Sequence, residues 1–198
     1  MIEEKLLASG IAYIAGVDEA GRGACAGPLV VAAVILRDLW DPKLDDVTDS
    51  KKLTSEKREL LFTKIVDSAL AYSIIEISPE EIDQKGLHSS NIEGMRRAAG
   101  SLSIRPEYIL TDGYAIPGLE IENLAIWKGD QVALSISAAS ILAKVYRDQV
   151  MNELDLKYPG YGFEFHKGYA TRTHEAAMEK LGISPIHRKS YANVARHL

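Results

Sequence analysis

The sequence predicts an α/β domain built on a mixed β-sheet. Two short, strongly apolar segments, residues 11–17 and 29–36, lie close together near the N-terminus and are typical of a strand hairpin. Segments with helical spacing of apolar residues alternate with further strand-like runs along the rest of the chain. The 198 residues show neither repeats nor a linker-like stretch. We therefore expect one domain over residues 1–198.

The hairpin is followed by a helix and a strand. Residues 57–70 carry leucine, isoleucine and valine at helical spacing, and Thr54 or Ser55 is suited to cap the N-terminus of this helix. Residues 72–77 are typical of a strand.

The next two helices have recognisable starts. Ser78, followed by a proline and two glutamates, is a typical N-cap of a short helix that Gly86 ends. Ser90, with Glu93 three residues later, repeats the capping-box pattern and predicts a helix to about residue 102.

The second half of the chain alternates in the same way. Residues 108–111 and 121–127 are short strand candidates. A long helix is expected over 131–154, and a shorter one over 173–181. Strands mixed with helices after an initial hairpin favour a mixed rather than a purely parallel sheet.

Acidic residues stand where three of these strands end: Asp18 with Glu19, then Asp112, then Asp130. Strand ends that converge at one edge of a sheet would bring these carboxylates together. Such a group would repel itself unless a cation balanced it. Carboxylate oxygens are ligands that Mg²⁺ prefers, and two such ions support phosphodiester cleavage. The pattern thus suggests a metal site.

Each acidic position also has a purely structural explanation. Asp130 could be the N-cap of the long helix, and Asp112 with Gly113 could form an ordinary turn. Asp18 and Glu19 are adjacent in a strand, so their side chains point to opposite faces. Both reach one site only if the chain bends at Glu19, which the glycines that follow would permit.

Charge is divided unevenly along the chain. The net charge is −5, yet the residues from 157 onward hold seven Lys and Arg against three Asp and Glu. A protein that coats DNA would be basic throughout. An acidic site for cations beside a basic segment for phosphate fits this division better, although such asymmetry also arises by chance.

The remaining composition excludes several classes of protein. The single cysteine, Cys25, cannot form an internal disulfide and is expected to be a small buried residue. The N-terminus is acidic where a signal peptide would be basic. The apolar run over 24–36 is too short to span a bilayer. We expect a cytoplasmic protein with no membrane partner.

Two segments could contact phosphate. The backbone N–H groups of Gly21-Arg22-Gly23 could form an anion-binding nest, to which Arg22 adds charge. Residues 48–54, which include Lys51 and Lys52, are either a second contact or a solvated loop.

Taken together, these segments resemble the ribonuclease HII family, the type 2 ribonucleases H. The match runs in order from about residue 12 to His187-Arg188. It rests on these motifs: Gly16-Val17-Asp18-Glu19-Ala20-Gly21-Arg22-Gly23, Ala26-Gly27-Pro28, Asp49-Ser50-Lys51-Lys52-Leu53, Asp112-Gly113, Lys128-Gly129-Asp130, Ile136-Ser137-Ala138-Ala139-Ser140-Ile141-Leu142-Ala143-Lys144-Val145, Tyr158-Pro159-Gly160-Tyr161-Gly162-Phe163 and His166-Lys167-Gly168-Tyr169.

The resemblance implies a ribonuclease H-like fold: a mixed five-stranded sheet flanked by helices, with a small basic helical portion over 155–198. It implies a metal-dependent endoribonuclease, using Mg²⁺ or Mn²⁺ in a two-metal mechanism and acting as a monomer. Its substrates would be RNA–DNA hybrids and duplex DNA that contains single ribonucleotides. Cleavage 5′ of the ribonucleotide would leave 3′-hydroxyl and 5′-phosphate ends.

The resemblance also assigns roles to residues. The metal-binding catalytic carboxylates would be Asp18, Glu19, Asp112 and Asp130. The RNA–DNA junction would be contacted by Gly21, Arg22 and Gly23 at the 2′-hydroxyl and phosphate, by Tyr169 at a sugar, and by Lys52 at a phosphate. Asp148, in Tyr146-Arg147-Asp148, also belongs to a family pattern, and we interpret it as structural.

Three other functions compete with this one. A related nuclease of the resolvase or integrase type would use similar carboxylates on DNA alone. A non-catalytic nucleic-acid-binding domain could keep the fold. An acidic metal-buffering protein would need neither the glycine–arginine loop nor the basic tail. The glycine loop, Tyr169 and all four carboxylates together favour ribonuclease HII.

Overall fold

The protein, described here over residues 1–198 as a computed structural model, contains one five-stranded sheet in the order β3-β2-β1-β4-β5. The strands are β1 (Ile14–Ala20), β2 (Leu29–Leu36), β3 (Ala69–Ile77), β4 (Tyr108–Asp112) and β5 (Glu122–Ile126). The pairs β1–β2 and β2–β3 are antiparallel, whereas β1–β4 and β4–β5 are parallel. The predicted hairpin and mixed five-stranded sheet are confirmed.

Eight α-helices and three short 3₁₀ turns surround this sheet. The helices are α1 (Ile2–Ala8), α2 (Ser55–Ser68), α3 (Pro79–Lys85), α4 (Leu87–Gly100), α5 (Leu134–Lys157), α6 (Phe163–His166), α7 (Arg172–Leu181) and α8 (Ala192–Ala195). The 3₁₀ turns are η1 (Pro42–Leu44), η2 (Ser50–Lys52) and η3 (Gly129–Gln131). None of the helices combines the length and the apolar character needed to cross a bilayer.

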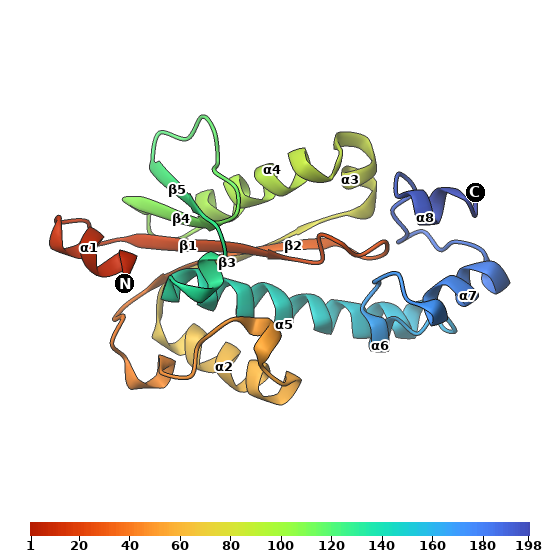
Figure 1. Ribbon diagram of the computed structural model, residues 1–198, viewed down its shortest axis with the longest axis horizontal. Coiled ribbons are helices and arrows are strands. Elements are labelled where there is room, and N and C mark those ends of the chain that lie inside the picture. The colour runs from red at the N-terminus through yellow and green to blue at the C-terminus, as the bar shows by residue number, and fades with distance from the viewer.

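Helices cover both faces of the sheet, so two cores form (Figure 1). On one face α4 packs against β1, β2 and β3; on the other α5 packs against β1 and β2, with α2 beside α5. Every residue of β2 is buried. This double coverage explains why residues 29–36 form an unbroken apolar run instead of alternating with polar residues.

Close contact between β1 and α5 depends on one glycine. A Cβ atom at Gly16 would lie 2.1 Å from the carbonyl carbon of Ser135. Only glycine therefore lets the start of α5 lie directly on the strand that carries Asp18 and Glu19.

The start of α5 differs from the alternative considered for Asp130. Asp130 lies in η3, and the N-cap position of α5 belongs to Ala133, which offers no capping side chain. Glu3 of α1 supplies the cap instead: its Oε1 accepts hydrogen bonds from the backbone N–H and the hydroxyl of Ser135, both at 3.0 Å. Asp130 is therefore free for another role.

The predicted start of α4 was wrong. This helix begins at Leu87. Gly86, with a φ of 81°, is both the C-cap of α3 and the N-cap of α4. Ser90 is inside the helix and buried, so it does not act as an N-cap. The short helices α1, α6 and α8 were not predicted, because their few residues show little periodicity.

Candidate active site

The predicted carboxylates gather at one edge of the sheet because β1, β4 and β5 run parallel. Asp18 and Glu19 lie near the carboxyl end of β1, and Asp112 is the last residue of β4. Asp130 follows β5 within η3. Parallel neighbours present the same end at the same edge, so strand order brings together acids that are far apart in sequence.

Two cavities share this edge. The first, of about 220 Å³, is lined by three of the carboxylates, the glycine loop and an aromatic ring: Asp18, Glu19, Asp112, Gly21, Arg22, Gly23 and Tyr169. The second, of about 330 Å³, shares Glu19, Arg22 and Asp112 with the first and adds Asp130. All four predicted carboxylates thus surround one connected region.

The expected bend at Glu19 is absent. Pairing of β1 with β2 continues through Glu19 to Ala20, opposite Val31 and Val30. Asp18 and Glu19 therefore stay on opposite faces, and the first cavity extends around the end of the strand so that both side chains line it.

Burial and mutual repulsion raise the pKa values of three of these acids, Asp18, Glu19 and Asp130. The pKa of Asp18 lies well above its ordinary value because the side chain is buried and faces Glu19 and Asp112. Burial, with Asp112 nearby, raises the pKa of Glu19 to about 7, although Arg22 opposes this rise. The pKa of Asp130 is raised by burial and by the charge of Asp112. The chain alone does not balance the negative charge that it concentrates here.

The carboxylates fit a hard divalent cation by their chemistry. All four supply oxygen donors, and the buried Oε2 of Glu19 has no hydrogen-bond partner in the chain. No three acidic, histidine or cysteine side chains form a preassembled ligand cage. Two carboxylates instead accept from neighbouring backbone: Asp18 Oδ1 from the N–H of Glu19 at 2.7 Å, and Asp112 Oδ1 from that of Gly129 at 2.7 Å.

Arg22 is held by an aromatic residue that the sequence did not single out. Its Nη1 donates to the hydroxyl of Tyr114 at 2.7 Å, and its guanidinium carbon lies 4.4 Å from the centre of that ring. Tyr114 comes two residues after Asp112, the last residue of β4. The end of this strand therefore positions both an acid of the site and the tyrosine that binds Arg22. The backbone N–H groups of Gly21, Arg22 and Gly23 donate to no acceptor in the chain, so they are available to a ligand.

The lysine in this region is Lys51, not Lys52. Lys51 lines both cavities, and its Nζ lies 3.8 Å from Asp130 Oδ2. Lys52 is exposed and lines neither. The difference follows from η2: Asp49 accepts from the N–H of Lys51 at 2.9 Å, and Ser50 is hydrogen-bonded to Ser140 of α5 at 2.8 Å. This anchored turn presents Lys51 to the carboxylates. The phosphate contact expected of the exposed Lys52 stays a prediction.

Two buried arginines support the glycine loop from below. Arg147 donates to the carbonyls of Pro28, Lys167 and Ala26 at 2.9 to 3.1 Å. Arg188 donates to the carbonyls of Gly27 and Arg22 at 3.1 Å. With these carbonyls directed inward, the loop is fixed against α5 and the C-terminal segment. A Cβ atom at Gly21, whose φ is 88°, would lie 1.9 Å from Arg147 Nε, so only glycine fits.

Comparison with known proteins decides the family. The family model described as Ribonuclease HII matches residues 15–194. The chain belongs to the ribonuclease HII family. It is 53% identical over 195 residues to Ribonuclease HII of Mycobacterium avium (strain 104), which covers 98% of this chain and 85% of the relative. It is 51% identical over 194 residues to Ribonuclease HII of Salinispora arenicola (strain CNS-205), with coverage of 98% and 72%.

A solved structure agrees with this assignment. The crystal structure of the ribonuclease H2 from Pyrococcus horikoshii OT3 has a TM-score of 0.80 and 32% identity, covering 93% of this chain and 96% of that one. The ribonuclease H-like fold is therefore confirmed. As a member of the ribonuclease HII family, the protein is a hydrolase that acts as an endonuclease on RNA–DNA hybrids. Enzymes of the ribonuclease H family depend on divalent metal ions.

In this ribonuclease HII, a chain of histidines holds Tyr169. The N–H of Ser184 donates to His187 Nδ1 at 2.9 Å, so the proton of His187 is on Nε2, which lies 3.0 Å from His174 Nε2. His174 must then carry its proton on Nδ1, which donates to the carbonyl of Tyr169 at 3.0 Å. Burial lowers the pKa of His187 to about 4 and also lowers that of His174. Both rings are therefore neutral at pH 7.

Proposed function

We propose that the protein cuts the RNA strand of RNA–DNA hybrids and also incises duplex DNA 5′ of a single ribonucleotide, leaving 3′-hydroxyl and 5′-phosphate ends. One observation carries this proposal: the carboxylates Asp18, Glu19 and Asp112 share a single cavity with the glycine loop and Tyr169. The acids alone would be enough for a site that hydrolysed phosphodiester bonds without distinguishing RNA from DNA. The loop and the ring add the means to recognise a ribose.

The glycine loop is suited to read the 2′-hydroxyl. This group is what distinguishes RNA from DNA at a given position. The free N–H groups of Gly21, Arg22 and Gly23 can donate to its oxygen and to the neighbouring phosphate. Since backbone amides do not contact base edges, recognition would be independent of base sequence.

Tyr169 is suited to pack against a sugar. This residue is 40% exposed, and the Arg147 guanidinium lies 5.7 Å from the centre of its ring. Arg147 lies against one face of the ring, and His174 holds the backbone carbonyl of Tyr169. The free face of the ring would then meet the deoxyribose next to the ribonucleotide. The loop and the ring would thus contact the two nucleotides of an RNA–DNA junction.

The four carboxylates would hold two Mg²⁺ or Mn²⁺ ions. Bound there, these ions supply an activated water for attack on phosphorus and stabilise the leaving 3′-oxygen. Asp18, Glu19, Asp112 and Asp130 provide the ligand oxygens, and Lys51 is placed to contact a phosphate oxygen beside them. Because one chain carries all of these residues, we propose that it acts as a monomer.

The test uses an end-labelled DNA duplex that contains one ribonucleotide, beside an all-DNA duplex and an RNA–DNA hybrid of the same sequence. With Mg²⁺ we expect a single cut 5′ of the ribonucleotide, no cut in the all-DNA duplex, and loss of cleavage with EDTA. Cleavage of the all-DNA duplex would support a resolvase-like nuclease instead. Cleavage of the hybrid alone would refute junction recognition.

A further inference from the structure

A larger pocket adjoins the active-site cavity and has no role in the function proposed above. Its volume is about 440 Å³, and it lies between α2, α5 and α6. Lys144 of α5 lines both this pocket and the active-site cavity, so the two are continuous along α5. Only Val145 and Phe165 among its eleven lining residues are apolar. The lining therefore favours a polar occupant that extends out of the active site.

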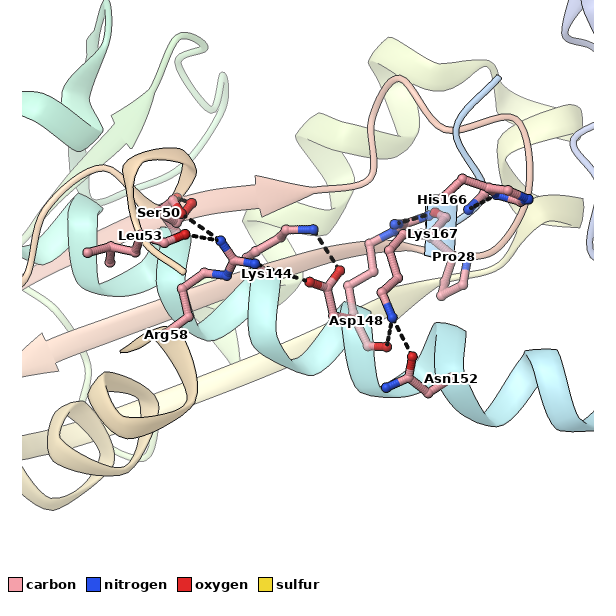
Figure 2. Close-up of polar contacts among 12 residues, drawn as sticks. Pro28, Ser50, Leu53, Arg58, Lys144, Asp148, Asn152, His166 and Lys167 are labelled. Atoms are coloured by element: carbon pink, nitrogen blue, oxygen red, sulfur yellow. Dashed lines mark hydrogen bonds and ion pairs between the residues drawn. The ribbon is translucent and has the colours of Figure 1, made fainter. Parts of the chain in front are cut away.

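In one wall of the pocket, Asp148 lies between two cationic side chains, Lys144 and Arg58 (Figure 2). Lys144 Nζ donates to Asp148 Oδ1 at 2.7 Å, and Arg58 Nη2 lies 3.8 Å from Oδ2. Arg58 is tied further by donating Nη1 to the carbonyls of Ser50 and Leu53, at 3.1 and 2.6 Å. One carboxylate is thus matched by two cations, so this wall has an excess of positive charge.

Lys167, the residue directly after α6, adds a third cation to the lining. Its Nζ donates to the carbonyl of Asp148 at 3.4 Å and to Asn152 Oδ1, as Figure 2 shows. Lys167 has a φ of 52°, a left-handed conformation that glycine or asparagine adopts more easily. A lysine at such a position suggests that its side chain is needed there. The carbonyl of Lys167 binds Arg147, which also holds the glycine loop.

Two further features favour the backbone of a nucleic acid. Ser55, the first residue of α2, lines the pocket, so the positive end of a 14-residue helix is directed toward it. Phe165 on the opposite side is 81% exposed. Cations for a phosphate next to a solvent-exposed ring for a sugar match the alternating chemistry of a sugar–phosphate chain.

We propose that this pocket binds a phosphate of the nucleic-acid backbone outside the reacting cavity, through Lys144 and Lys167, with Phe165 against the adjoining sugar. This inference rests on the proposed nucleic-acid substrate. Glu59 and Glu164, both exposed, also line the pocket and oppose an anion. The contact therefore adds to binding at the active site rather than replacing it, and it weakens as salt concentration rises.

The first experiment removes one charge without disturbing the backbone. Lys167→Asn keeps a residue that tolerates the left-handed conformation, Lys167→Arg keeps the charge, and Lys85→Asn on α3 is a control far from the pocket. Affinity for a ribonucleotide-containing duplex is measured by fluorescence anisotropy in EDTA, from 50 to 300 mM NaCl. We expect Lys167→Asn to weaken binding about 3- to 10-fold and to lower the slope of log K against log[salt] by about 1. Lys167→Arg and Lys85→Asn should keep the wild-type slope.

A second variant changes the affinity in the opposite direction. Glu164 is exposed and makes no hydrogen bond or ion pair through its side chain, so Glu164→Gln should fold normally. It removes a charge that opposes phosphate, and we expect binding to tighten about 2- to 3-fold at low salt. This outcome separates a phosphate contact from a structural role of the pocket, since a structural role predicts no gain.

The phosphate that the pocket contacts can be located by replacing single phosphodiesters of the duplex with neutral methylphosphonate linkages. Placed one at a time along each strand, they should weaken wild-type binding at one position outside the cleavage site, where Lys167→Asn should show no further loss. An unchanged salt slope in Lys167→Asn together with unchanged affinity in Glu164→Gln would overturn the pocket assignment. That result would leave the proposed function intact if the duplex is still cut. The binding assay thus tests the pocket, the cleavage assay tests the proposed function, and either proposal can be refuted without the other.

Discussion

At the scale of single residues, Asp18 and Glu19 show how adjacent acids acquire different surroundings. Asp18 faces α5, where Ser140 lowers its pKa slightly against the large rise caused by burial. The rise in the pKa of Glu19 is opposed by Arg22 of the glycine loop and then by Asn91 of α4. Each acid is therefore buried next to a different helix while both line the same cavity.

Replacing Asp18 should separate activity from stability. Asp18→Asn keeps the shape of the side chain but removes a charge that burial and two neighbouring acids destabilise. We expect cleavage of the RNA–DNA hybrid to fall by about 10²- to 10³-fold or more, as on loss of one group that stabilises transition-state charge. The thermal midpoint should be unchanged or higher, since relief of repulsion favours the folded state. Full activity in this variant would refute the ligand assignment.

Tyr169 permits a graded test of junction recognition. Tyr169→Phe keeps the ring and should cleave the ribonucleotide-containing duplex at close to the wild-type rate, whereas Tyr169→Ala should lose about 10-fold or more in kcat/KM. Calorimetric titration with Mn²⁺ should show similar metal binding in both variants. Equal junction kinetics for alanine and tyrosine would remove this residue from the site.

At the scale of elements, the N-terminus of α5 depends on Glu3 of α1. Glu3 is fully buried and is the only cap of a 24-residue helix whose N-terminus lies on β1. Glu3→Ala should therefore lower the free energy of unfolding by about 1–2 kcal/mol, the usual cost of a lost N-cap. Lys5→Ala, at an exposed position on the same helix, serves as the control. Urea denaturation of both variants measures the difference.

The histidine chain beneath α7 should make stability depend on pH. The pKa of His187 falls on folding from about 6.5 to about 4, because burial and then the neighbouring His174 disfavour the charged ring. Folding thus favours the neutral ring. This contribution is complete above about pH 6.5 and is lost progressively as pH falls toward 4.

The comparison of wild type with His187→Gln isolates this contribution. Thermal midpoints are measured from pH 7.5 to 4, with His88→Gln as a control at an exposed histidine. The wild type should lose stability with falling pH more steeply than His187→Gln, and His88→Gln should follow the wild type. Parallel curves for wild type and His187→Gln would contradict the lowered pKa of His187.

At the scale of the whole molecule, the C-terminal segment supplies Tyr169 to the cavity that the carboxylates line. Figure 1 shows α6, α7 and α8 grouped at one end of the sheet, beside the connection from β1 to β2. Arg188 of this segment donates to the carbonyl of Gly27 in that connection. The N–H groups of Cys25 and Ala26 in the connection donate in turn to the carbonyl of Gly168. The basic portion predicted over 155–198 thus packs on the loop that precedes β2.

Arg188 should couple this packing to catalysis. Arg188→Met removes hydrogen bonds to the carbonyls of Gly27 and Arg22, leaving buried acceptors without donors at a cost of roughly 3 kcal/mol. We expect a lower urea midpoint and, under conditions where the variant is folded, a raised KM for the ribonucleotide-containing duplex. Arg172→Met, at an exposed position of α7, is the matched control. A wild-type KM in Arg188→Met would show that the loop is held without it.

Local signals predicted much of the architecture. The apolar run of β2, the caps Thr54 and Ser78, and the long helix α5 are encoded by neighbouring residues, so their positions agree with the structure within a few residues. The start of α4 could not be predicted, because a capping box at Ser90 is chemically sound and only packing on the sheet shows that the helix starts earlier.

The sequence by itself determined the composition of the site: its acids, its glycine loop and its family, since these depend on residue types and their order. Only the tertiary structure decided which groups act together. It showed that Asp130 does not cap α5, that Lys51 rather than Lys52 meets the carboxylates, and that Arg147 and Arg188 hold the loop. The physical reason is that these contacts join residues distant in sequence. Their geometry depends on strand order and helix packing, which no local pattern records.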